Sequence, residues 1–132
     1  ERFFQGIRHY YSMYAGKTAL TQDFKEVMEA GGGVSLDTFF RQWLYQPGWP
    51  EYEFTWRWDE AAGEVEVVIR QVQPTGLFDM SLDIAVTSGG QIVIHRAHVA
   101  NLTHTFRLPA GERPNAVQLD PGDWLLKAIV KR

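Results

Sequence analysis

Residues 39–50, FFRQWLYQPGWP, mark the point at which the chain changes from one kind of secondary structure to another. Before this stretch apolar residues recur at helical spacing, and after it they alternate with polar residues as in a strand. Pro47 ends the helix, because its ring disfavours the helical conformation in the preceding residue. The stretch therefore predicts a junction between a helical segment at 1–46 and a β-domain at 51–132.

Three helices are expected before the junction. The first carries a broad apolar face and ends at Gly16. We expect Thr21 to cap the second helix, the glycine triplet 31–33 to end it, and Ser35 to cap the third. The three apolar faces consist, in order, of Phe3, Ile7, Tyr10 and Tyr14, then Phe24, Val27 and Met28, then Leu36, Phe39, Phe40, Trp43 and Leu44.

Seven short strands are expected after the junction, each bounded by turn-forming Pro, Gly, Asp or Ser residues. Helices followed by strands, without interleaving, favour the α+β class. The strand count and spacing are typical of a seven-stranded antiparallel immunoglobulin-like sandwich. The expected strands are 52–58, 64–73, 80–86, 92–99, 102–108, 117–119 and 124–130.

Composition excludes several classes of function. The absence of cysteine excludes disulfide scaffolds, thiolate metal sites and cysteine nucleophiles. The net charge of -3 and the pI of about 5.8 give no reason to expect a nucleic-acid partner. No apolar run approaches the roughly 20 residues that cross a bilayer, so no membrane partner is expected.

No set of residues forms a catalytic constellation. The stretch YSMYAGKT at 11–18 ends like a phosphate-binding loop, but Tyr11 stands where that motif needs its first glycine. His95 and His98, with His104 nearby, are candidate metal ligands, yet strand residues three apart point to opposite faces. We therefore expect no catalytic and no metal-binding residue in this chain. A small zinc enzyme that uses these histidines is a weaker alternative.

Three tryptophans offer a different alternative. Trp49, Trp56 and Trp58 lie close in sequence at the start of the β-domain and could form a flat sugar-binding platform. Strand alternation more simply predicts an inward-facing row for the last two. The alternative function is thus a stand-alone β-sandwich binding module for a glycan or a protein.

Residues 3–54 resemble a passage in the zinc-dependent aminopeptidases related to aminopeptidase N and leukotriene hydrolase, the gluzincin metallopeptidases. The resemblance rests on landmarks in a fixed order, and an Asp-Pro-x-x-x-Leu segment at 120–125 extends it. The landmarks are Thr-x-Asp-Phe at 21–24, Met-Glu at 28–29, the glycine break at 31–33, Leu-x-x-Phe-Phe-x-Gln-Trp at 36–43 and Pro-Gly-x-Pro at 47–50.

The resemblance implies a C-terminal fragment of a larger enzyme. In that family such helices close a thermolysin-like catalytic domain, and a β-sandwich domain follows. The H-E-x-x-H zinc helix, its glutamate ligand and the substrate-amine motif are absent from these 132 residues. Zinc and peptide hydrolysis are therefore expected of the parent protein and not of this chain. The uncapped helical start at Glu1, with no initiator Met, agrees with that expectation.

The residues expected to matter are those of a domain junction or interface. Ten of the 18 aromatic residues lie in the first 45 positions, which suggests a surface made for a partner. We expect that partner to be the catalytic domain of the parent, and we expect self-association when that domain is absent. The candidate interface residues are Phe39, Phe40, Trp43, Pro47, Gly48, Trp49 and Pro50.

Overall fold

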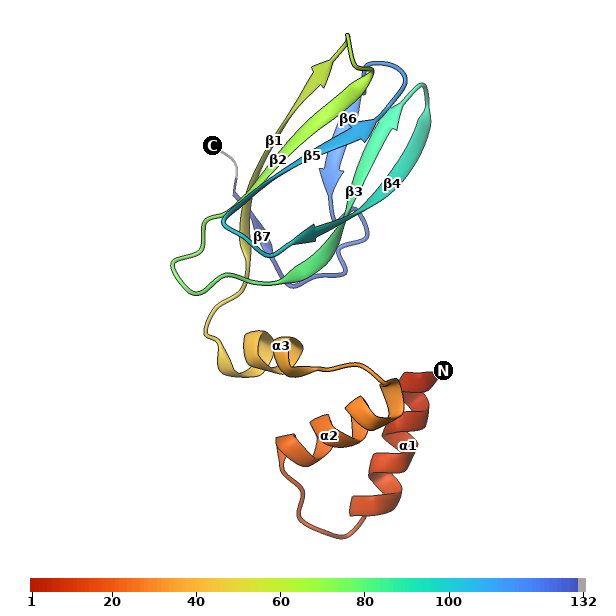
Figure 1. The fold of residues 1–132 in the computed structure, drawn as a ribbon, viewed down its shortest axis with the longest axis vertical. Coiled ribbons are helices and arrows are strands. Elements are labelled where there is room, and N and C mark those ends of the chain that lie inside the picture. Colours follow the sequence, from red (N-terminus) through yellow and green to blue (C-terminus); the bar gives the residue numbers. More distant parts are fainter. Residues whose placement is uncertain (131–132) are drawn as a thin grey trace. The chain divides into compact units, whose positions relative to one another are not determined.

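The computed structural model describes residues 1–130 and divides into two compact units (Figure 1). The helical unit comprises Glu1–Tyr45, and the sheet unit begins at Gln46. All helices lie in the first unit and all strands in the second, so the predicted α+β class is confirmed.

The helical unit contains two longer helices and one short one. They are α1 at Arg2–Tyr14, α2 at Thr21–Gly32 and α3 at Asp37–Phe40, which continues as the π-helical turn η1 at Arg41–Tyr45. α2 ends as predicted at the glycine triplet: Gly33 adopts a φ of 68°, and its N–H donates to the Glu29 carbonyl at 2.8 Å.

Two glycines let α1 and α2 approach closely. A Cβ atom placed on Gly6 would lie 2.7 Å from the Met28 Sδ atom, and one on Gly31 would lie 3.6 Å from the Gly6 Cα atom. Beside this crossing the rings of Tyr10 and Phe24 pack edge to face, with centroids 5.0 Å apart.

The predicted helix caps are wrong in both cases. Thr21 is the first residue of α2, and the Asp23 carboxylate instead accepts the Leu20 N–H at 2.7 Å, which satisfies the exposed start of the helix. Ser35 forms no cap for α3 either. Its hydroxyl lies 3.3 Å from the Asp37 N–H, one residue too early in the helix for the usual cap.

The single apolar face predicted for the third helix is also wrong. The π-helical turn holds more residues per turn than an α-helix, so side chains after Phe40 leave the predicted stripe. Phe40 is buried, but Phe39 and Leu44 are 54% and 55% exposed, and the polar Gln42 is buried instead.

Up to residue 130, the sheet unit contains seven strands in two sheets, in the orders β5-β2-β1-β7 and β4-β3-β6. The number of strands agrees with the prediction. The strands are β1 at Glu51–Asp59, β2 at Glu64–Gln71, β3 at Met80–Ser88, β4 at Gln91–Val99, β5 at Thr103–Pro109, β6 at Ala116–Leu119 and β7 at Ala128–Ile129.

One core lies within this unit and is built by alternate residues of both sheets. Val65, Val67 and Ile69 of β2 are fully buried, as expected for every second residue of a strand with one face on the core. The remaining members of the core cluster are Tyr52, Leu82, Ile84, Val86, Ala97, Val99, Leu108, Val117 and Leu119.

Two features of the last strand differ from the prediction. Only Ala128 and Ile129 are strand, because the segment before them folds into a loop around Asp120. In addition, β7 runs parallel to β1, with Glu51 opposite Ala128, whereas all other pairs are antiparallel. The predicted wholly antiparallel arrangement is therefore wrong at this edge.

Candidate functional site

The Pro-Gly-Trp-Pro segment is anchored to the sheet unit through Gly48. This residue has a φ of 81°, a conformation that favours glycine. A Cβ atom here would lie 3.1 Å from the Thr75 Oγ1 atom, so the backbone of the segment lies directly against the loop after β2. The conformation favours glycine at this position, and the space beside Thr75 is tight for any side chain.

Three glutamines hold the same loop in place. Buried Gln71 donates to the Phe78 carbonyl at 2.8 Å and accepts the Phe78 N–H at 2.9 Å. Gln46 donates to the Gly76 carbonyl at 2.8 Å, and Gln73 accepts the Glu51 N–H at 3.2 Å. The loop is thus tied at one end to β2 and at the other to the start of β1.

The predicted interface residues have different surroundings. Pro50 is buried at the start of the sheet unit, Pro47 is exposed, and Trp49 is 49% exposed. In the helical unit Phe40 is buried and Trp43 half-buried. Within each unit these residues therefore differ in exposure, and their role as an interface stays a prediction.

The helical unit contains an apolar groove between its three helices, which brings together two of the predicted residues, Phe39 and Phe40. Its volume is about 290 Å³. The rest of the lining is almost wholly apolar and comes from Arg2, Phe3, Phe24, Met28, Gly32, Val34 and Leu36.

An ion pair joins α2 to α3, two of the helices that line the groove. Lys25 of α2 forms an ion pair with Asp37 at the start of α3 and lies 3.7 Å from Glu29. The Lys25 hydrogen bond, followed by that of Ser35, lowers the pKa of Asp37. Glu29 also accepts the Leu36 N–H at 2.7 Å, so α2 fixes the loop that leads to the groove.

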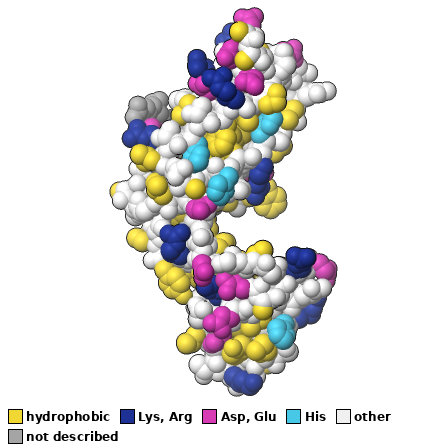
Figure 2. All heavy atoms as spheres, viewed as in Figure 1, with side chains coloured by type: hydrophobic (Ala, Val, Ile, Leu, Met, Phe, Trp, Pro, Cys, Tyr) yellow, Lys and Arg dark blue, Asp and Glu magenta, His cyan; other side chains and the backbone are white. Residues whose placement is uncertain are grey.

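The helical unit buries few apolar side chains. Val27, Met28 and Phe40 are its buried hydrophobic residues, and large apolar side chains reach its surface (Figure 2). The exposed large apolar residues of this unit are Phe3, Phe4, Tyr11, Met13, Leu20, Val34, Phe39, Leu44 and Tyr45. So much exposed apolar surface on so small a unit is typical of a surface made for a partner.

The histidines do not converge on a metal site. His98 is exposed and lies 3.1 Å from Asp79, whereas the Nε2 atom of His95 is buried on the inward-facing side of β4. His104 has a structural role, since its Nε2 accepts the N–H groups of Ala100 and Asn101 at 3.1 and 3.0 Å. Within residues 1–130, no cluster of three or more His, Cys, Asp or Glu could hold a metal ion.

The three tryptophans form no common platform. Trp56 and Trp58 are partly buried and pack against the core of the sheet unit. Trp49 alone of the three is exposed. The row predicted by strand alternation is present, and the exposed sugar-binding surface is not.

Two structural features were missed by the sequence analysis. Gln71 could have been noticed, because it is a polar residue at an inward position that continues the series Val65, Val67 and Ile69. The pair Asp120 and Lys127, with nitrogen and oxygen 2.7 Å apart, is buried. The sequence indicated a turn at Asp120-Pro121, but nothing in it indicated that Lys127 would form an ion pair with Asp120.

Comparison with known proteins gives a structural similarity and no sequence similarity. No family model matches the chain, and no curated protein matches it. The fold is similar to that in the crystal structure of Legionella pneumophila aminopeptidase A in complex with aspartic acid, with a TM-score of 0.79 at 15% identity. The match covers 100% of this chain and 16% of the Legionella chain. The chain therefore has a fold found within an aminopeptidase and spans a small part of that protein's length.

None of the helices in the described residues is long and apolar enough to cross a bilayer.

Proposed function

We propose that this chain is a non-catalytic C-terminal part of a zinc aminopeptidase related to aminopeptidase N and leukotriene hydrolase, which removes N-terminal residues from peptides. In this proposal zinc belongs to the parent enzyme, since the described residues offer no ligand set for it. The helical unit closes the catalytic domain, and the sheet unit supports it as an immunoglobulin-like sandwich.

The observation that carries the proposal is the unmatched apolar surface of the helical unit. Its groove exposes Phe3, Val34 and Phe39 at 58%, 58% and 54%. A catalytic domain that covered this surface would remove these side chains from water, at about 25 cal/mol for each Å² buried. The likeness to a segment of the Legionella aminopeptidase supports the same assignment at the level of fold.

The sheet unit fits a supporting role because several of its polar side chains bind other parts of the same unit. Gln71 and Gln73 bind loop backbone, and the outer face of β1, β2 and β5 carries an ion-pair network among Arg57, Glu66 and Arg107. These contacts tie the strands and the loop after β2 to one another, which suits a support for another domain.

The first test uses an environment-sensitive hydrophobic dye with the purified chain. We expect strong fluorescence that falls substantially in Phe39→Ser, because this variant removes one wall of the groove. Leu126→Ser is the matched control: Leu126 is 67% exposed but lies in the sheet unit. Equal fluorescence in the two variants would argue against the groove as the partner surface.

The second test asks whether the parent is the proposed enzyme. The gene is sequenced upstream of Glu1, and the longer product is assayed on aminoacyl nitroanilides with and without a zinc chelator. We expect an H-E-x-x-H helix, chelator-sensitive hydrolysis and loss of dye binding at the groove. A reading frame without that motif, or hydrolysis by the 132-residue chain alone, would contradict the proposal.

A further inference from the structure

Among the strands in the described residues, β4 forms a sheet edge without the usual protection against pairing. Strands β6 and β7 are short, with four and two residues. Strand β5 ends at the exposed Pro109, which discourages edge pairing, and it has no run of exposed apolar residues. Strand β4 has nine residues, and its successive Ile92, Val93 and Ile94 are 66%, 46% and 51% exposed.

The backbone of β4 also presents free hydrogen-bonding groups at this edge. In β3 the Thr87 carbonyl accepts the Asn115 N–H at 2.8 Å, and the Asp83 carbonyl accepts the Asp120 N–H at 2.6 Å. Both donors flank β6, so Thr87 and Asp83 turn their hydrogen-bonding groups toward β6 and away from β4. In an antiparallel sheet, residues directly opposite each other either exchange hydrogen bonds or both turn away from each other. Ile92 and Arg96, which lie opposite Thr87 and Asp83, therefore turn their N–H and C=O groups to the free edge.

We propose that β4 pairs with β4 of a second copy of this chain, antiparallel about a two-fold axis at Val93. In this register Ile92 of each copy lies opposite Ile94 of the other. The outward N–H and C=O groups of both residues then meet their counterparts, as in an ordinary antiparallel ladder. Four isoleucines form one apolar cluster, and two three-stranded sheets become one six-stranded sheet.

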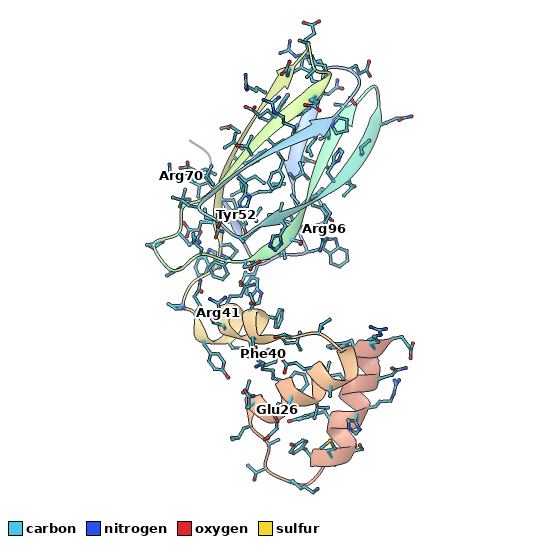
Figure 3. All side chains as sticks on the ribbon, viewed as in Figure 1. Glu26, Phe40, Arg41, Tyr52, Arg70 and Arg96 are labelled. Atoms are coloured by element: carbon cyan, nitrogen blue, oxygen red, sulfur yellow. The ribbon has the colours of Figure 1, made fainter. Side chains whose placement is uncertain are left out.

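The charges on and near the strand favour a second copy as the partner. The same register places Arg96, labelled on β4 in Figure 3, opposite Gly90 of the other copy, so no like charges face each other. Arg96 is already paired with Asp83 of β3, with the Nη1 and Oδ1 atoms 2.9 Å apart. The Glu112 carboxylate lies against Gly89 beside the turn, so both signs of charge flank the paired segment in each copy.

This inference goes beyond the proposed function, because it concerns the sheet unit and does not depend on any catalytic domain. It also predicts a different surface from the groove of the helical unit. Loss of association in Phe39→Ser and loss in a β4 variant are therefore separable results.

Disulfide formation provides the first test, since the chain contains no cysteine. In the proposed register the two Val93 residues form a non-hydrogen-bonded pair, with Cα atoms about 4.5 Å apart, within the range that a disulfide spans. In the same register each Ile92 lies opposite Ile94 of the other copy and not opposite the other Ile92. The two Ile92 Cα atoms are therefore about 8 Å apart, beyond the range that a disulfide spans. Under mild oxidation we expect Val93→Cys to form covalent dimers at least about tenfold faster than Ile92→Cys.

Sedimentation equilibrium of the whole chain provides the second test. Ile94→Lys introduces a charge at the paired edge and is expected to raise the dimer dissociation constant at least about tenfold. Gln118→Lys is the control, because Gln118 is an exposed residue on β6, at the opposite edge of the same sheet, and should leave association unchanged.

Three outcomes would overturn the inference. The chain could be monomeric at all concentrations, Val93→Cys could cross-link no faster than Ile92→Cys, or Ile94→Lys and Gln118→Lys could sediment alike. Association that persists in Ile94→Lys but is lost in Phe39→Ser would place the contact at the groove, which would support the proposed function and reject the β4 pairing.

Discussion

Lys127 and Asp120 form a buried ion pair in the loop that leads from β6 to β7. The Lys127 Nζ atom lies 2.7 Å from the Asp120 Oδ2 atom, and the two side chains are only 5% and 2% exposed. Asp120 also accepts the N–H groups of Trp124 and Leu125 at 3.2 and 3.1 Å. This loop positions the short parallel strand β7 against β1.

Removal of Lys127 is expected to destabilise the fold strongly. Lys127→Met leaves the Asp120 carboxylate buried without its cation, at a cost of about 3 kcal/mol in the free energy of unfolding. Chemical denaturation monitored by tryptophan fluorescence measures this loss. Asp123→Asn is the control, because the Asp123 side chain is 89% exposed and its loss should cost less than about 1 kcal/mol.

The Asp120–Lys127 pair makes the free energy of unfolding depend on pH in the acid range. Burial raises the pKa of Asp120, but the hydrogen bonds from Lys127, Leu125 and Trp124 outweigh burial, and the net pKa is lowered. A carboxyl with a lowered pKa stabilises the folded state above its unfolded value of 3.8, and this contribution is lost as the pH falls below that value. We expect the free energy of unfolding to fall less steeply below pH 4 in Asp120→Asn than in the wild type. Parallel curves would contradict this role for Asp120.

Replacement of Tyr52 by phenylalanine is expected to stabilise the protein or leave it unchanged. Tyr52 is fully buried, and its hydroxyl has no hydrogen-bond partner among the described residues. Loss of an unsatisfied hydroxyl is worth up to about 1 kcal/mol. Denaturant titration at pH 7 measures the difference, with Tyr11→Phe as the exposed control.

Alkaline titration tests the environment of Tyr52 independently. Burial raises its pKa from 10.0 to about 12. A raised pKa stabilises the folded state below pH 10, and this contribution disappears as the pH rises from 10 to 12, since the unfolded chain ionises first. Tyr52→Phe should therefore lose less stability than the wild type between pH 10 and 12. An equal loss would show that the ring is hydrated.

The crossing of α1 and α2 should tolerate no large side chain at Gly6. Gly6→Leu places atoms where the Met28 side chain now lies, and overpacking of this kind costs about 2 kcal/mol. Gly31→Ala is the control, because its Cβ would make an ordinary contact at 3.6 Å while alanine favours a helix. Circular dichroism at 222 nm during denaturation measures both. Equal stability of the two variants would contradict the close crossing.

Gly48 should be required at the start of the sheet unit for two reasons that can be separated. Gly48→Ala must adopt a φ of 81° and also approach Thr75, so we expect a loss greater than the roughly 1–2 kcal/mol of conformational strain alone. Gly63→Ala has a similar φ of 66° with open space around its Cβ, and isolates the strain. Thermal unfolding of the two variants gives the comparison, and a smaller loss in Gly48→Ala would show that Thr75 moves aside.

The sequence by itself determined the order of the elements and the position of the break between them. Period 3.6 before residue 46 and period 2 after residue 51 follow from local backbone geometry, and Pro47 and Gly48 act through their own φ angles. The ends of α2 and most strands were therefore predictable. So was the inward row of Trp56 and Trp58, because alternation is a property of the strand itself.

The tertiary structure decided what depends on residues far apart in the chain. The π-helical turn exposes Leu44 and buries Gln42, which no local periodicity indicates. The parallel pairing of β7 with β1 joins residues more than 70 positions apart, and the Asp120–Lys127 pair that precedes it gains its strength only from burial. The apolar groove likewise exists only in the folded helical unit, because Phe3, Val34 and Phe39 come from segments that are separate in the sequence.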